Sequence, residues 1–148
     1  MTIKRAIAIA ACAACAVVLV FVALVLALFR GYFDSGLFEV KESCQSSNGR
    51  VALVGKRSDH QAMSSDQYFV LVEDHLLTPR ELRAALHSDR VVFSASDDCV
   101  GVRWRDAENL TVLCRGGTID RGHINVQRSR VKGVTISYED IPAVTPES

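Results

Sequence analysis

Cysteine is the residue of this chain whose chemistry depends most on its surroundings, and there are five. Cys12 and Cys15 form a C-x-x-C pair, but both lie in an apolar stretch, where we interpret them as small apolar residues. Cys44 lies in a polar loop and Cys99 at a polar turn, so the sequence favours a Cys44–Cys99 disulfide in an oxidising compartment. Cys114 alternates with apolar residues of a predicted strand, which predicts a buried free thiol. Cys99 and Cys114 are neighbours across a predicted hairpin but face opposite sides of it, an arrangement that a bulge at Asp97-Asp98 could undo.

The other polar residues form no recognisable catalytic pattern. The histidines are scattered, and the sequence contains no H-E-x-x-H, G-x-S-x-G or phosphate-binding loop. Glu73-Asp74 and Asp97-Asp98 are carboxylate pairs at predicted strand ends and turns, where we expect them to be solvated. The sequence therefore predicts no catalytic residue, no cofactor and no metal site, and a protein that is not an enzyme.

Basic residues are concentrated between positions 115 and 132, where Asp120 is the only acid. On a domain held near a bilayer, such a patch could bind anionic head groups or an acidic partner. The alternative is an ordinary solvated turn region. The predicted patch consists of Arg115, Arg121, Arg128, Arg130 and Lys132.

An apolar segment stands near the N-terminus. Residues 6–29 are 24 successive residues without a charge, an amide, a proline or a glycine. As a helix this segment would be about 36 Å long, enough to cross a hydrocarbon core of about 30 Å. Cleaved signal peptides have apolar regions of about 7–15 residues, and only six apolar residues precede Cys12, the cysteine of the lipobox-like IAAC. We therefore predict a cytoplasmic tail at 1–5 and an uncleaved transmembrane helix at 6–29 that binds the lipid bilayer.

The flanking charges indicate how the segment is oriented. Lys4, Arg5 and the amino terminus precede it, whereas Arg30 and Lys41 follow it among acidic residues. Acids count little in the positive-inside rule, so the balance favours an N-terminus inside the cytoplasm. The prediction is a single-pass protein of the inner membrane whose C-terminal domain is extracytoplasmic, or periplasmic.

The rest of the chain predicts a small domain that is mainly β. We expect a juxtamembrane linker at 30–49, an antiparallel β-sheet or sandwich at 50–140 and a flexible tail at 141–148. Thr78, Pro79 and Glu81 form a capping box with proline at the first helical position, which predicts one short helix over a face or end of the sheet. Strands are expected at 50–57, 68–74, 90–96, 100–105, 110–115, 123–127 and 131–139.

Two of these strands predict a hairpin with a defined register. Apolar residues occupy the even positions of both 100–105 and 110–115, and a buried face requires even positions to lie opposite even positions. The single tryptophan then belongs to the core. The predicted opposite pairs are Trp104–Leu110, Val102–Val112 and Val100–Cys114.

Charge gives no sign of nucleic-acid binding. Three of the 17 basic residues lie at or before residue 30, so 14 basic and 17 acidic residues remain beyond it. A slightly acidic domain lacks the positive surface that binds phosphate backbones.

Several segments together resemble a group of small bacterial envelope proteins of unknown function. They are "SSNGRVALVGKRSD", "YFVLVED", "VVFSAS", "VRWRDAENLTVLC" and "VKGVTISYE", within residues 46–139. Trp104, Asp106 and Leu110 match the V-x-W-x-D-x-x-x-L-x-I-x-Y motif of that group, while "HQAMSS" stands in place of its C-G-A-T-T segment. The resemblance implies an N-terminal hydrophobic or lipoprotein segment before a β domain, and no activity.

These observations predict a non-enzymatic, single-pass binding module of the cell envelope. Its partner would be a protein, for example an envelope protein or a secreted toxin against which this chain is an immunity factor. One alternative is an accessory structural subunit of a larger membrane complex. The other is an envelope hydrolase or redox protein whose site is assembled from distant residues.

Overall fold

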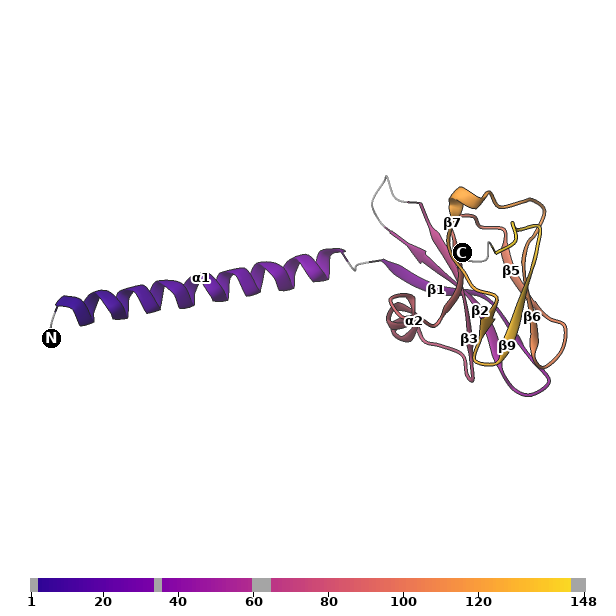
Figure 1. Ribbon diagram of the computed structural model, residues 1–148, viewed down its shortest axis with the longest axis horizontal. Helices are drawn as coiled ribbons and strands as arrows, with labels where there is room; N and C mark the ends of the chain where they lie inside the picture. The colour runs from indigo at the N-terminus through magenta and orange to yellow at the C-terminus, as the bar shows by residue number, and fades with distance from the viewer. Residues whose placement is uncertain (1–2, 34–35, 60–64, 145–148) are drawn as a thin grey trace. The chain divides into compact units, whose positions relative to one another are not determined.

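The computed structural model describes residues 3–33, 36–59 and 65–144. The chain divides into two compact units, residues 1–35 and 36–148. The first contains a helix, and the second is a β domain (Figure 1).

Helix α1 (Ile3–Phe33) is 31 residues long. It extends the predicted helix at both ends, into the expected tail at 1–5 and the expected linker at 30–49. Six successive side chains, from Val17 to Val22, are each 46–69% exposed, and six successive positions cover every side of an α-helix. Counting only the residues that the structure describes, no helix is long and apolar enough to cross a membrane.

Among its described residues the domain contains two sheets and one α-helix, which confirms a mainly β fold. Sheet A is antiparallel throughout, whereas sheet B is mixed because β6 and β9 run parallel. The expectation of purely antiparallel pairing is therefore wrong for sheet B. Sheet A has the order β1 (Leu37–Gln45), β2 (Val51–Ser58), β3 (Gln67–Glu73), β4 (Val91–Ala95), β7 (Ile124–Gln127). Sheet B has the order β5 (Val100–Trp104), β6 (Asn109–Cys114), β9 (Val134–Glu139), β8 (Arg130–Val131).

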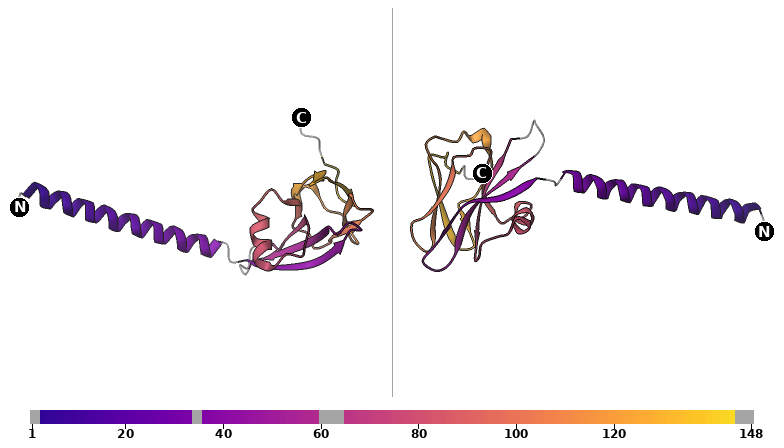
Figure 2. Two further views of the ribbon diagram at one scale, coloured as in Figure 1. Left: turned by 90° about the horizontal axis from the view of Figure 1, so that it is seen from below. Right: turned by 180° about the vertical axis from the view of Figure 1, so that it is seen from behind.

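The elements form three layers, with sheet A between helix α2 (Pro79–Leu86) and sheet B (Figure 1; Figure 2). Successive side chains of a strand point to opposite faces of the sheet, so apolar residues of sheet A contribute to a core on each of its faces. In β3, Val70 and Val72 belong to the core between the sheets, while Phe69 and Leu71 pack with Leu82 of α2. The three central strands of sheet A, β2, β3 and β4, are thus buried on both faces, as their nearly continuous apolar sequences require.

Helix α2 begins with the predicted capping box. The side chain of Thr78 accepts a hydrogen bond from the Glu81 backbone, and Glu81 in turn accepts one from the Thr78 backbone at 2.8 Å. Pro79 occupies the first helical position. The predicted helix and its place over the sheet are confirmed.

The β5–β6 hairpin has the predicted register, with Trp104 opposite Leu110 and Val100 opposite Cys114. The predicted Cys44–Cys99 disulfide is wrong, because Cys99 is bonded to Cys114 and Cys44 is free. Cys99 lies in the turn that precedes β5. Strand alternation therefore does not hold its side chain away from Cys114, and the two Cα atoms are 4.7 Å apart.

Strand β1 lies within the segment predicted as a linker, residues 30–49, and corrects that prediction. A register shift between Val40 and Glu42 interrupts the alternation of side chains. Phe38 packs in the core beside α2, whereas Cys44 packs against the core between the sheets. The apolar positions of β1 therefore do not alternate regularly with polar ones. For this reason the sequence pattern did not predict this edge strand.

The predicted strand at 131–139 is a hairpin, β8 and β9, joined by Lys132 and Gly133. Both residues have positive φ, 45° and 77°, as the two central residues of a type I′ turn require. The predicted tail at 141–148 is also partly wrong. Ile141 is buried, and the Gln127 side chain donates a hydrogen bond to the Pro142 carbonyl at 2.6 Å; residues 145–148 lie outside the described part.

Candidate functional site

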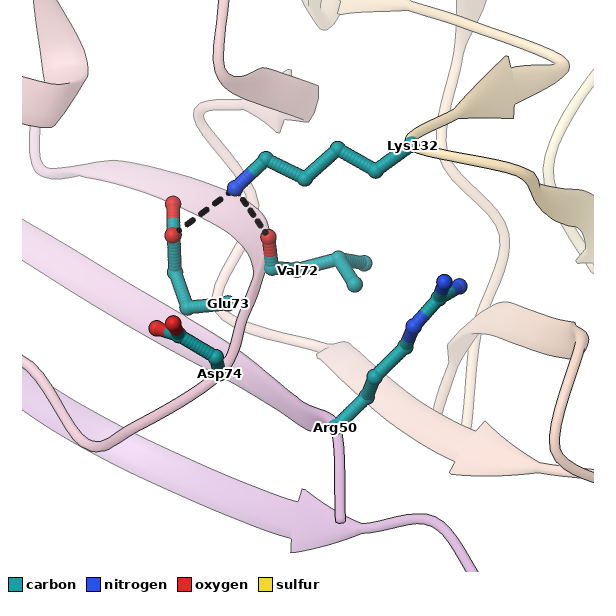
Figure 3. Close-up of a pocket in the computed structure, with 5 residues that line it drawn as sticks. All are labelled: Arg50, Val72, Glu73, Asp74 and Lys132. Carbon is teal, nitrogen blue, oxygen red and sulfur yellow. Dashed lines mark hydrogen bonds and ion pairs between the residues drawn. The ribbon is translucent and has the colours of Figure 1, made fainter. Parts of the chain in front are cut away.

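A shallow pocket of about 170 Å³ lies where β3 ends and the β8–β9 hairpin of sheet B approaches sheet A. It combines two cations, two carboxylates and one apolar side chain (Figure 3). The residues that line it are Arg50, Val72, Glu73, Asp74 and Lys132.

Arg50 is held in place by the loop between β1 and β2. The backbone N–H of Ser46 donates to the Arg50 carbonyl at 2.8 Å, and the Ser46 hydroxyl accepts from the Arg50 backbone N–H at 3.0 Å. Gly49 turns the loop with φ of 87°, a conformation that glycine adopts without strain. These contacts fix the Arg50 backbone. In the Arg50 side chain, the Nη1 atom is buried and has no hydrogen-bond partner among the described residues.

Glu73 is a buried carboxylate, only 4% exposed. Arg90 donates to Oε1 from Nε at 2.9 Å and from Nη2 at 2.6 Å, and Lys132 donates to Oε2 at 3.0 Å. Burial by itself would raise the pKa of Glu73, but the hydrogen bonds from these two cations outweigh it and lower that pKa. The expectation of a solvated Glu73 is wrong, because residues distant in sequence cover it.

Lys132 connects the two sheets across this pocket. Its ammonium group donates to the Val72 carbonyl at 3.3 Å as well as to Glu73. An ammonium group has three protons, so one remains for another acceptor. Lysine is an uncommon residue at positive φ, where asparagine and glycine are preferred.

Asp74 lies at the pocket rim, with its side chain 88% exposed, as predicted for a solvated carboxylate. It accepts a hydrogen bond from His75 at 2.6 Å, which lowers the pKa of Asp74 and raises the pKa of His75. In Figure 3 the guanidinium of Arg50 points away from both Glu73 and Asp74. Neither carboxylate of this pocket therefore pairs with Arg50.

A second, open pocket of about 380 Å³ adjoins the first, since both include Asp74. Cys44 lines it, but burial raises the pKa of this thiol and its Sγ lies 3.9 Å from the Val102 carbonyl. A protonated thiol is a poor nucleophile. The residues that line this pocket are Ser43, Cys44, Gln45, Val51, Asp74, His75 and Leu76.

The predicted basic patch is distributed over different partners. Arg115 pairs with Glu42 of β1 at 2.7 Å, and Arg121 and Arg128 donate to backbone carbonyls of Ala143 and Asp89. Arg130 is exposed in β8, and only Lys132 lines the first pocket. Intramolecular contacts thus occupy four of the five predicted patch residues.

No group of histidine, cysteine and acidic side chains within the described ranges could hold a metal ion. The Nδ1 atom of His123 lies 3.1 Å from Oδ2 of Asp97. The Asp97-Asp98 pair, expected to be solvated, is therefore partly in contact with a histidine. His60 lies outside the described residues.

Compared with protein families, curated proteins and solved structures, this chain matches none significantly. The resemblance to bacterial envelope proteins therefore stays a prediction, and the functional argument depends on the residues themselves.

Proposed function

We propose that this chain is a membrane-anchored binding module of the cell envelope, with its β domain outside the cytoplasm and no catalytic role. The observation that carries the binding function is the pocket beside Arg50, where a buried guanidinium nitrogen has no partner among the described residues. A buried polar group without a partner is costly, by about 1–3 kcal/mol. A ligand that supplies the missing acceptor removes that cost.

Support for the anchor comes from the sequence of residues 6–29 taken as a whole, which contains no charge over 24 positions. The exposed apolar side chains from Val17 to Val22 add to it, because a helix that is apolar on all sides requires an apolar environment. Lipid supplies that environment on every side of the helix at once.

Support for the extracytoplasmic side comes from the Cys99–Cys114 disulfide. Disulfides form and persist in oxidising compartments and are rare in the cytosol. The charges of Lys4 and Arg5 before the apolar segment favour the same orientation.

Reporter fusions at the C-terminus test the location. We expect activity from a reporter that folds only outside the cytoplasm, and none from its cytoplasmic counterpart. Activity of the cytoplasmic reporter alone would overturn the proposed topology.

Alkaline extraction of membranes tests the anchor. The chain should remain in the pellet, whereas Val20→Arg should move a large fraction to the supernatant, because a central arginine costs about 2.5–3.5 kcal/mol. Val20→Leu is the matched control and should behave like the unmodified chain. Complete release of the unmodified chain would refute the anchor.

A further inference from the structure

We propose that the pocket of Arg50 and Lys132 binds a carboxylate presented by a peptide segment of a partner protein. This inference deepens the proposed binding function and rests on it. The carboxylate is either a chain terminus or an acidic side chain, which share one chemistry.

The first argument is the unused hydrogen-bonding capacity of Arg50. Its Nη1 is buried and unpartnered within the described part of the chain, and the loop contacts of Ser46 fix its backbone. A guanidinium presents a planar fork of N–H groups that matches the two oxygens of a carboxylate. Because the backbone that carries the fork is already fixed, part of the ordering cost of binding is avoided.

The second argument is the position of Lys132. Its φ of 45° is a conformation in which lysine is uncommon, and glycine or asparagine would form the same turn with less strain. What lysine adds is its long side chain, which reaches Val72 and Glu73 and retains a free proton beside the pocket. Backbone strain, such as the positive φ of Lys132, is typically retained at functional sites such as binding sites.

The third argument is charge. Arg90 and Lys132 pair with Glu73, and His75 pairs with Asp74, whereas the Arg50 guanidinium points away from both carboxylates (Figure 3). A carboxylate carries one negative charge and matches the single positive charge of Arg50. A phosphate monoester carries about 1.5–2 negative charges at neutral pH and would leave an excess next to Glu73.

The fourth argument is access for a chain. The first pocket shares the exposed Asp74 at its rim with the second, open pocket. Leu76, which lines the second pocket, is 60% exposed although it is apolar. A peptide whose carboxylate meets Arg50 can therefore lay a neighbouring apolar side chain on Leu76.

The experiment is an NMR titration of the full chain in lipid nanodiscs, labelled with ¹⁵N-arginine and observed at the Arg50 Nε–H resonance. The probes are N-acetyl-glycine for a terminal carboxylate and N-acetyl-glutamic acid α-amide for a side-chain carboxylate. N-acetyl-glycinamide is the neutral control, and inorganic phosphate is the competing anion. We expect at least one carboxylate to shift the resonance saturably in the millimolar range, at least tenfold more tightly than the amide and phosphate.

The variants assign the effect to the pocket. Arg50→Lys keeps the charge but loses the planar fork. It should weaken binding at least fivefold, measured for both chains at the Lys132 backbone amide in uniformly ¹⁵N-labelled protein. Arg103→Gln is the control, because it removes a positive charge from an exposed pair with Glu139 and should leave binding unchanged. Trp104 fluorescence confirms that each variant is folded.

Three results would overturn the inference: shifts that do not saturate with either carboxylate, equal binding of the amide or phosphate, or unchanged affinity in a folded Arg50→Lys variant. None of them bears on the reporter fusions or alkaline extraction. Failure of the carboxylate site and failure of the membrane-anchored module are therefore distinguished.

Discussion

Removal of the Cys99–Cys114 disulfide should destabilise the β domain by about 3 kcal/mol. The two cysteines are 15 residues apart, and a disulfide that closes a loop of about 15 residues removes about 3 kcal/mol of chain entropy from the unfolded state. Cys114 is 2% exposed, so alanine is the appropriate replacement, since serine would bury a hydroxyl group. The test protein is the double variant Cys99→Ala/Cys114→Ala.

The assay is urea unfolding of the full chain in detergent, followed by tryptophan fluorescence. Trp104 is the only tryptophan, and its Nε1 donates to the Cys44 carbonyl at 3.1 Å, which joins β5 to β1. The signal therefore reports the β domain and not α1. With a urea dependence of about 1–3 kcal/mol per molar, the midpoint of the double variant should fall by about 1–3 M.

Cys44→Ala is the matched control, because it removes a thiol that forms no disulfide. It should lower stability by about 1 kcal/mol or less. Before reduction three thiols of the wild-type chain should react with maleimide in denaturant, since Cys12, Cys15 and Cys44 are free. Five reactive thiols, or a double variant within about 0.5 kcal/mol of the wild type, would refute the reasoning.

Three further substitutions test contacts that stabilise the β domain, each by the same urea assay. Glu73→Gln should cost about 2 kcal/mol at pH 7 because it loses charged hydrogen bonds from Arg90. The pKa of Glu73 is lowered in the folded state, so this stabilisation is complete above about pH 4.3. The variant and wild type should converge as pH falls further, and a difference in stability that does not shrink with falling pH contradicts the assignment. Gly55→Ala should cost about 1–3 kcal/mol, because an added Cβ would lie 2.5 Å from the Phe69 ring, and an unchanged midpoint would show that the ring does not cover Gly55. Thr78→Ala should cost about 1 kcal/mol through loss of the helix cap, and Thr78→Ser should restore most of it.

Local patterns predicted much of the fold correctly. The hairpin register followed from alternation alone, because a one-residue slip would place Trp104 and Val102 on the wrong face. The cap of α2 followed from Thr78 and Glu81 because its hydrogen bonds join residues three apart. Both are local features, so neighbouring residues contain all the information they need.

The candidate site was missed because its members come from distant parts of the chain. Arg50 precedes β2, Glu73 ends β3 and Lys132 lies in the β8–β9 turn. One signal was present, since Lys132-Gly133 interrupts a β-rich segment as a turn dipeptide would. Nothing in the local sequence indicates that the lysine of this turn reaches a carboxylate 59 positions away.

The sequence by itself determined the apolar N-terminal segment, the mainly β character of the domain, its one capped helix and the pairing of β5 with β6. These depend on composition and on periods of two or about four residues. Only the tertiary structure decided that Cys99 bonds Cys114, that β1 is a strand, that β6 and β9 run parallel and that Glu73 is buried. Each of those outcomes depends on which distant surfaces meet when the sheets pack, and burial then determines whether a carboxylate, a thiol or a guanidinium is solvated, paired or left for a ligand.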